Sequence, residues 1–301
     1  MSEILDCLII GGGPAGQAAA IYMARFRRSL LLLDGGDSRA RLIPRSRNLP
    51  GFPGGIHGQD LLDRLELQVA DLGTAFRHAR VEALRLSPEG HFEASHGGEA
   101  LRARTVILAT GVVERLPDLA GVTEAIEGGA VRICPICDAY EARDQRIAVL
   151  GGADHAANEA LFLRTYSRRV TLVLAPSANL SEAARRELAE ARVEVVRATP
   201  SSFHLEGRQV RLESREWDAP RRFDVVYSAF GVEPQAGLAV GLGARTDAEG
   251  RLRVAAHQET SVPGLFAAGD VVRGLNQISV AEGEGAVAAC GAHTRLGRNP
   301  C

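Results

Sequence analysis

Apolar runs followed by glycine-rich turns and helical patterns occur twice along this chain. The first run, 4–10, ends in Gly11-Gly12-Gly13-Pro14-Ala15-Gly16 and leads into a helical pattern over 17–27 and an apolar stretch at 29–33. The second run, 146–150, ends in a related turn at 151–156, followed by a helical pattern to Tyr166 and an apolar stretch at 170–174. Strand, turn, helix and strand in this order predict two nucleotide-binding βαβ units.

The rest of the chain shows further periodic segments. Short alternating stretches at 80–104 predict a β-meander, and 105–109 predicts a buried strand. Asn179, with Glu182 three residues later, predicts a capped helix ending near 190. The remaining expected elements are a helix at 58–72, strands through 229, strands at 252–255 and 265–268, and a helix at 279–296.

Composition narrows the class of protein. The chain has 301 residues, with 33 glycines, 46% hydrophobic and 5% aromatic residues, which favours an α/β protein of two domains. Its formal charge of −2 gives no overall attraction to nucleic acid or membranes. Because no apolar run reaches the roughly 20 residues that span a bilayer and no signal peptide is recognisable, we expect a cytoplasmic protein.

Two cysteines separated by two residues, Cys134 and Cys137, are followed at once by Asp138. At the start of a helix, such a pair has a lowered thiolate pKa and forms a disulfide that opens and closes. A carboxyl beside it is suited to proton transfer. A zinc site would need a second Cys/His pair at ligand spacing, and none is found, so no metal is expected.

The first glycine turn has the spacing of a dinucleotide site. Glycines at 11, 13 and 16 permit a tight turn, the approach of a pyrophosphate and close packing of helix on strand. Asp34 ends the following strand, where an acid meets a ribose hydroxyl.

The second turn departs from that pattern. Ala153 stands where the template has glycine, and its methyl group would crowd a pyrophosphate. The next strand ends in Leu174-Ala175-Pro176, which offers neither a base for a 2′-phosphate nor an acid for a 2′-hydroxyl. Arg185 and Arg186 are the nearest downstream basic pair, and we expect them on a solvated helix face.

With these segments placed, the whole chain resembles the low-molecular-weight (class II) thioredoxin reductase family of FAD enzymes. The matching segments, in the family's order, are 11–16, 48–53, 109–111, 134–138 and 260–270, with Asn276-Gln277 behind them. The resemblance implies an α/β fold of two doubly wound, Rossmann-like domains. The FAD domain would comprise 1–116 and 247–301, and 117–246 would form the NAD(P)H-type domain with the redox disulfide.

The same resemblance implies roles for individual residues. Cys137 would exchange electrons with the flavin, Cys134 would react with the substrate disulfide or dithiol, and Asp138 would handle protons. The FAD-binding residues would be Gly11, Gly13, Pro14, Ala15, Gly16, Asp34, Asn48, Thr110, Gly111, Gly269, Asp270, Gln277 and Ile278. We expect a homodimer, with a thioredoxin-like protein or a small dithiol or disulfide as partner.

The departures from the family pattern at Ala153 and at 174–176 change the expected electron donor. Family members that use NADPH carry a His-Arg-Arg run where this chain has 174–176. Two lost charge-assisted contacts, each contributing about 1.5–3 kcal/mol, correspond to roughly two to four decades of affinity. The leading hypothesis is therefore a thiol-disulfide oxidoreductase without efficient NADPH use, linked to ferredoxin or oxygen as in some relatives. The alternatives are an NADPH-dependent thioredoxin reductase, in which Arg185 or Arg186 reaches the phosphate, and a non-catalytic flavin redox sensor.

The remaining cysteines, one histidine and a group of arginines are expected to have no role in catalysis. Cys7 and Cys290 are expected to be packing residues, and Cys301 a frayed terminus, with an electron relay as the alternative. His155 is expected to be a surface or packing histidine. A solvated loop is favoured over a docking surface for the arginines at 39, 41, 45 and 47.

Overall fold

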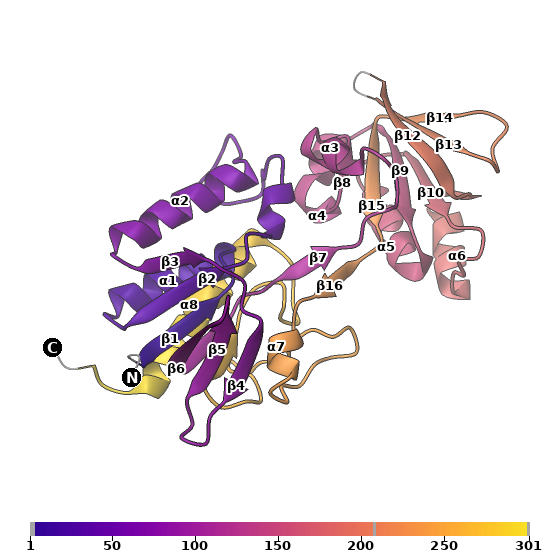
Figure 1. Cartoon of the computed structure of the whole chain (residues 1–301). Helices are drawn as coiled ribbons and strands as arrows, with labels where there is room; N and C mark the ends of the chain where they lie inside the picture. The colour runs from indigo at the N-terminus through magenta and orange to yellow at the C-terminus, as the bar shows by residue number, and fades with distance from the viewer. Residues whose placement is uncertain (1–3, 207–208, 300–301) are drawn as a thin grey trace.

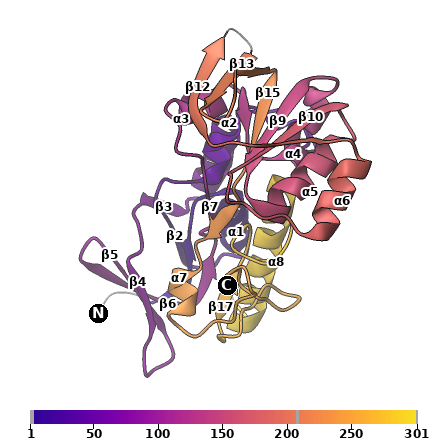
Figure 2. The same ribbon diagram turned by 90° about the vertical axis from the view of Figure 1, so that its right-hand side faces the viewer.

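The computed structural model of the chain describes residues 4–206 and 209–299. Figure 1 shows two bodies, each built on its own β-sheet, joined by the short antiparallel strands β7 (Val112–Glu114) and β16 (Val232–Pro234). Residues before β7 and after β16 build the first body, and the residues between them build the second. Figure 2 shows the chain turned by 90°, with the second body nearer the viewer and overlapping part of the first.

The first sheet is parallel at its centre and takes strands from both ends of the chain. Its order is β3-β2-β1-β6-β5-β4, and β17 pairs in parallel with the last three residues of β6. The antiparallel hairpins of β4, β5 and β6 extend from one side. The strands are β1 (Leu5–Ile10), β2 (Leu30–Asp34), β3 (Ala75–His78), β4 (Ala83–Leu86), β5 (Phe92–His96), β6 (Glu99–Leu108) and β17 (Leu265–Ala267).

Helices α1 (Pro14–Arg25), α2 (Gly58–Asp71) and α8 (Ile278–Leu296) pack on one face of this sheet. Alanines dominate the contact between α1 and α8, which allows the two backbones to approach closely. A Cβ on Gly285 would lie 2.2 Å from the carbonyl oxygen of Ala15, so only glycine fits there. This packing fixes the start of α8 beside the glycine turn that begins α1.

The second sheet is entirely parallel, with the order β11-β10-β9-β15-β8. A separate antiparallel sheet, β12-β13-β14, packs beside it. The elements of this body are α3 (Val122–Glu127), β8 (Val131–Arg132), α4 (Pro135–Asp138), η2 (Ala139–Ala142), β9 (Arg146–Gly151), α5 (Ala153–Leu163), β10 (Arg169–Leu174), α6 (Glu182–Glu190), β11 (Glu194–Arg197), β12 (Pro200–Glu206), β13 (Gln209–Ser214), β14 (Arg221–Phe223) and β15 (Val225–Ala229).

The first sheet with its parallel centre, the parallel second sheet and the helices packed on them confirm the predicted α/β, doubly wound architecture. Two local predictions are wrong. The N-cap of α6 is Ser181, whose hydroxyl accepts a hydrogen bond from the Ala184 N–H at 3.1 Å, so Asn179 is not the cap. Residues 252–255 form no strand, because Leu252 makes only isolated bridges. The domain limits 1–116, 117–246 and 247–301 stay a prediction.

The free cysteines differ in their surroundings. Cys7 is fully buried in β1, as predicted for a packing residue. Cys290 is exposed on α8, so its prediction as a packing residue is wrong within this chain. Cys301 lies outside the described residues. Across the described part of the chain, every helix is too short or too polar to cross a bilayer.

Candidate active site

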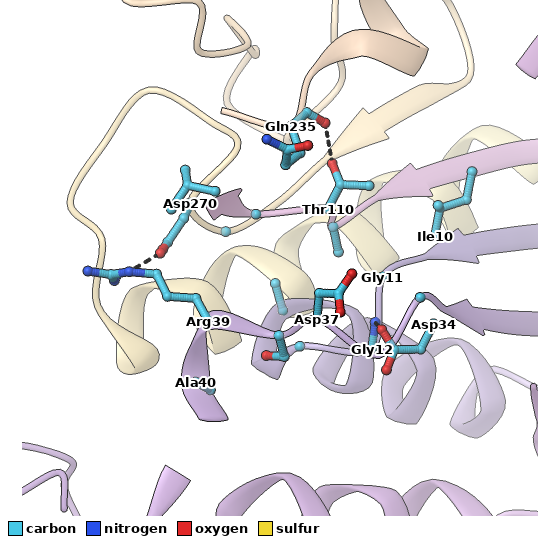
Figure 3. Close-up of a pocket in the computed structure, with 18 of the residues that line it drawn as sticks. Ile10, Gly11, Gly12, Asp34, Asp37, Arg39, Ala40, Thr110, Gln235 and Asp270 are labelled. Atoms are coloured by element: carbon cyan, nitrogen blue, oxygen red, sulfur yellow. Dashed lines mark hydrogen bonds and ion pairs between the residues drawn. The ribbon is translucent and has the colours of Figure 1, made fainter. Parts of the chain in front are cut away.

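A cavity of about 520 Å³ opens at the carboxyl ends of β1, β2, β6 and β17. This edge of a parallel sheet is where α/β proteins bind their ligands. Of the residues predicted to bind FAD, those lining the cavity are Gly11, Gly13, Pro14, Ala15, Asp34, Thr110, Gly111, Gly269, Asp270, Gln277 and Ile278. Figure 3 shows part of this lining.

The glycine turn between β1 and α1 is shaped for a ligand that approaches the backbone. Gly11 has φ +111°, and a Cβ there would lie 2.2 Å from the carbonyl oxygen of Ala109. Gly16 lies beneath the turn, where a Cβ would lie 1.8 Å from the Gly11 oxygen. Gly13 caps α1 without a side-chain partner, so the first N–H groups of the helix remain available to an anion. These features fit the diphosphate of FAD.

Asp34 is held at the end of β2 under this turn. One of its carboxyl oxygens accepts a hydrogen bond from the Gly12 N–H at 3.0 Å (Figure 3). A Cβ on Gly12 would lie 2.6 Å from the Asp34 carboxyl carbon, so the turn and the acid fit together closely. The carboxyl therefore has a fixed position in the wall of the cavity.

Arg39 lies in the cavity wall, so its prediction as part of a solvated loop is wrong. It is the first residue of the short helix η1 (Arg39–Leu42), and its guanidinium pairs with Asp270 at 3.3 Å (Figure 3). The same guanidinium also pairs with Glu114. Burial raises the pKa of both carboxyls, and Arg39 opposes that rise. No local sequence pattern singles out Arg39, because its partners lie far away along the chain.

Cys134 and Cys137 form a disulfide, which the second body holds against the cavity. The amide Nε2 of Gln277 lies 3.5 Å from Sγ of Cys137 and 3.6 Å from Sγ of Cys134. Asn48 does not line the cavity, but its amide donates to Gln277 Oε1 at 2.9 Å and to the Ile136 carbonyl at 3.5 Å. The cavity and the disulfide therefore share one hydrogen-bonded boundary.

Asp138 has two partners that the sequence did not reveal. Its Oδ1 accepts a hydrogen bond from the Tyr227 hydroxyl at 2.7 Å and lies 3.7 Å from Nη1 of Arg132. Burial raises the pKa of Asp138 to about 6, although Arg132 and Tyr227 act in the opposite direction. The helix after Cys134 is α4, a single turn of four residues, so its dipole acts only weakly on a Cys134 thiolate.

The second glycine turn is strained where the sequence departs from the template. Ala153 has φ +54°, a left-handed conformation that costs a non-glycine residue roughly 1–2 kcal/mol. Beside it, the Asp154 carboxylate accepts a hydrogen bond from the Ser181 N–H at 2.9 Å. This carboxylate at the helix start would repel a pyrophosphate.

The arginines nearest the end of β10 have other partners. Arg197 donates to the carbonyls of Pro176 and Ala178, at 2.9 and 2.7 Å. Arg185 donates to the Leu180 carbonyl at 2.9 Å, and Arg186 pairs with Glu182 at 3.6 Å. The guanidinium groups expected on the α6 face are therefore engaged with their own helix and its N-terminal loop.

Other predicted residues have mixed outcomes. His155 is a surface histidine, as expected, and its ring lies 3.2 Å from Glu159, which raises the pKa of the imidazole. Arg47 pairs with Glu141 at 3.8 Å, just beyond the disulfide, so it contacts the second body. Among residues 4–206 and 209–299, no cluster of three or more His, Cys, Asp or Glu side chains could hold a metal.

Comparison with known proteins identifies the family. The family model of pyridine nucleotide-disulphide oxidoreductases matches residues 5–285. Thioredoxin reductase from Mycolicibacterium smegmatis is 35% identical, covering 97% of this chain and 96% of its own, and that from Streptomyces coelicolor is 33% identical, covering 98% and 95%. The crystal structure of thioredoxin reductase from Streptococcus pyogenes has a TM-score of 0.89 at 28% identity, covering 97% and 98%. The chain belongs to the pyridine nucleotide-disulphide oxidoreductase family and is a thioredoxin reductase-like, FAD-dependent disulfide oxidoreductase.

Proposed function

We propose that this enzyme exchanges electrons between FAD, the Cys134–Cys137 disulfide and an external dithiol or disulfide, without efficient use of NADPH. The observation that carries the proposal is the contrast between its two nucleotide turns. The first is a glycine cradle beside a cavity. The second has Ala153 at φ +54° and no basic residue at 174–176, and the nearby Arg197 is hydrogen-bonded to the carbonyls of Pro176 and Ala178.

The first body would hold FAD through the cavity residues. The N–H groups of Gly13 and of the first turn of α1 would bind the diphosphate, and Asp34 would bind the ribose. Arg39 and Asp270 would lie along the diphosphate and ribityl region, and Gln277 and Ile278 near the ring. When bound, FAD supplies a two-electron acceptor and donor.

The disulfide is the natural partner of that cofactor, because Gln277 touches both the cavity and the two sulfurs. Cys137 would face the cavity, and Cys134 would react with the substrate. Asp138 would give and take the proton, because a carboxyl with a pKa of about 6 is populated in both forms near neutral pH.

We also propose the external molecules with which the enzyme exchanges electrons. A thioredoxin-like protein or a small dithiol would exchange with Cys134, and ferredoxin or oxygen would complete the reaction at the flavin. We also propose a cytoplasmic homodimer, as in the family. Both relatives are named thioredoxin reductase, which favours one alternative, a thioredoxin reductase that would use NADPH. Against that alternative, Arg185 and Arg186 engage Leu180 and Glu182.

Turnover without pyridine nucleotide tests the proposal. The flavin-loaded enzyme should oxidise dithiothreitol in air, with oxygen uptake and no added NADPH. Cys134→Ser should abolish this turnover, whereas Cys290→Ser should leave it unchanged because Cys290 lies on the outer side of α8. Equal turnover by the Cys134→Ser variant, or reduction of thioredoxin that requires NADPH, would contradict it.

A further inference from the structure

Tyr227 is a buried tyrosine in a strand of otherwise small and aliphatic residues, and its hydroxyl has a specific position. Its side chain is fully buried within β15, between β9 and β8. In the sheet register, Tyr227 lies directly beside Arg132 of β8. The chain then turns through the disulfide loop and returns Asp138 to the same place. Residues 89 positions apart thereby meet beside the redox pair.

The hydrogen bonds among these residues form a closed set. The Tyr227 hydroxyl donates to Asp138 Oδ1 at 2.7 Å. Nη1 of Arg132 donates to the Tyr227 oxygen at 3.3 Å and to the Asp138 carbonyl at 2.7 Å. Thus both the backbone and the carboxyl of Asp138 are fixed. Within the described residues, Oδ2 makes no hydrogen bond, so it remains free to exchange a proton.

We propose that Tyr227 and Arg132 are positioning residues that hold Asp138 as the proton donor and acceptor of the Cys134–Cys137 pair. The inference rests on the proposed function of Asp138 and adds two residues to it. A phenylalanine at 227 would fill nearly the same space in the core, but it would leave the buried carboxyl without its donor. The hydroxyl and the guanidinium therefore serve the carboxyl and not merely the packing of the sheet.

The network would act during dithiol exchange. A substrate thiolate attacks Sγ of Cys134, the Cys134–Cys137 bond breaks, and its electron pair leaves with Cys137. Protonated Asp138 gives its proton to that sulfur, and the new carboxylate is stabilised by Tyr227 and Arg132. Asp138 then takes the proton of the second substrate thiol, which attacks the mixed disulfide. The substrate leaves as a disulfide, with Cys134 as a thiolate and Cys137 as a thiol.

The groups around Asp138 determine in which direction its pKa should move when the Tyr227 hydroxyl is removed. Arg132 from β8 and Tyr227 from β15 lower the pKa of Asp138, whereas burial and Glu141 from η2 raise it. Glu141 itself pairs with Arg47. Removing the Tyr227 hydroxyl should therefore shift the protonation of Asp138 to higher pH, by about one unit for a lost hydrogen bond to a charged group.

The test follows opening of the disulfide itself. Flavin-loaded protein is mixed anaerobically with dithiothreitol over a range of pH, quenched in acid, and its new thiols are alkylated and counted by mass. After division by the thiolate fraction of dithiothreitol, the wild-type rate should fall as pH rises through about 6. In Tyr227→Phe this midpoint should move up by about one pH unit. Tyr166→Phe, a control in the same core, should not move it.

A background variant separates positioning from packing. In Asp138→Asn, adding Tyr227→Phe should produce no further change in the pH profile. A Tyr227→Phe midpoint equal to that of the wild type would overturn the proposal, as would an equal shift in the Asp138→Asn background. If Tyr227→Phe does not fold, Arg132→Gln replaces it in both tests. We expect the midpoint to move to higher pH in that variant too. None of these readouts depends on NADPH, so failure here is distinguishable from failure of the proposed function.

Discussion

The side-chain amide of Gln277 lies 3.5 Å from the sulfur of Cys137, and Gln277 also lines the cavity at the edge of the first sheet. Gln277 is the N-cap residue of α8, whereas Cys137 belongs to the second body. One side chain from the first body therefore contacts the redox disulfide of the other. Asn48 fixes the amide by donating to its Oε1, which leaves Nε2 directed at the sulfurs.

Gln277→Leu should slow reduction of the flavin by dithiothreitol by roughly two- to tenfold, the effect of losing about 0.5–1.5 kcal/mol of hydrogen bonding. The reason is that Nε2 can donate to the sulfur that becomes negative when the disulfide opens. Stopped-flow absorbance measures the rate. Gln59→Leu, the same change on the surface of α2, is the control and should leave the rate of flavin reduction unchanged. A rate unchanged in Gln277→Leu would show that the contact is incidental.

Asp138→Asn should have opposite effects on rate and stability. Disulfide opening should slow by about a hundredfold or more, because a positioned acid is lost. The pKa of Asp138 rises from 3.8 to about 6 on folding, so the carboxyl favours the folded state at low pH and loses that effect as pH rises through about 6. Above that pH the neutral asparagine should therefore stabilise the fold, by roughly 1–3 kcal/mol.

Thermal or denaturant unfolding across pH checks the second effect of Asp138→Asn. The stabilisation should vanish below pH 3.8, where aspartate is neutral in both states. Asp218→Asn, at an exposed acid of the same body, is the control and should leave both profiles unchanged. An Asp138→Asn variant that is less stable than the wild type at every pH would contradict the expected direction of the effect.

Arg39→Ala should weaken FAD binding by roughly ten- to a hundredfold, as expected when a charge-assisted hydrogen bond worth about 1.5–3 kcal/mol is lost. It would also leave Glu114 and Asp270 facing a bound diphosphate without their cation. Flavin release on dilution, followed by the gain in free-flavin fluorescence, measures the effect. The neighbouring, exposed Arg41 provides the control as Arg41→Ala. Equal flavin retention by both variants would show that Arg39 does not contribute to flavin binding.

The local sequence pattern was sufficient to predict those parts of the site that are formed by the backbone. Both glycine turns, the strands that precede them and the helices that follow could be predicted, because each is specified by consecutive residues. The disulfide position was equally evident from the spacing of Cys134 and Cys137. The strand predicted at 252–255 failed because an apolar run does not reveal whether a partner strand lies beside it.

Long-range partners could not be found in the same way. Arg39 meets residues 75 and 231 positions away, and in sequence it is one of several arginines in a polar stretch. Tyr227 looks like an ordinary strand residue until the register of β15 and β8 places it beside Arg132. These relationships depend on tertiary packing, which no local pattern contains.

The most direct test of the central claim is an anaerobic titration of the flavin, comparing the wild type with Ala153→Gly/Ala175→Arg/Pro176→Arg. That variant relieves the positive φ of Ala153 and places two cations at the end of β10. Loss of oxidised flavin absorbance is followed with NADPH, then NADH, then dithiothreitol. We predict that dithiothreitol bleaches both proteins, whereas micromolar NADPH bleaches the wild type poorly and the triple variant better. Rapid, complete bleaching of the wild type by micromolar NADPH would contradict the account.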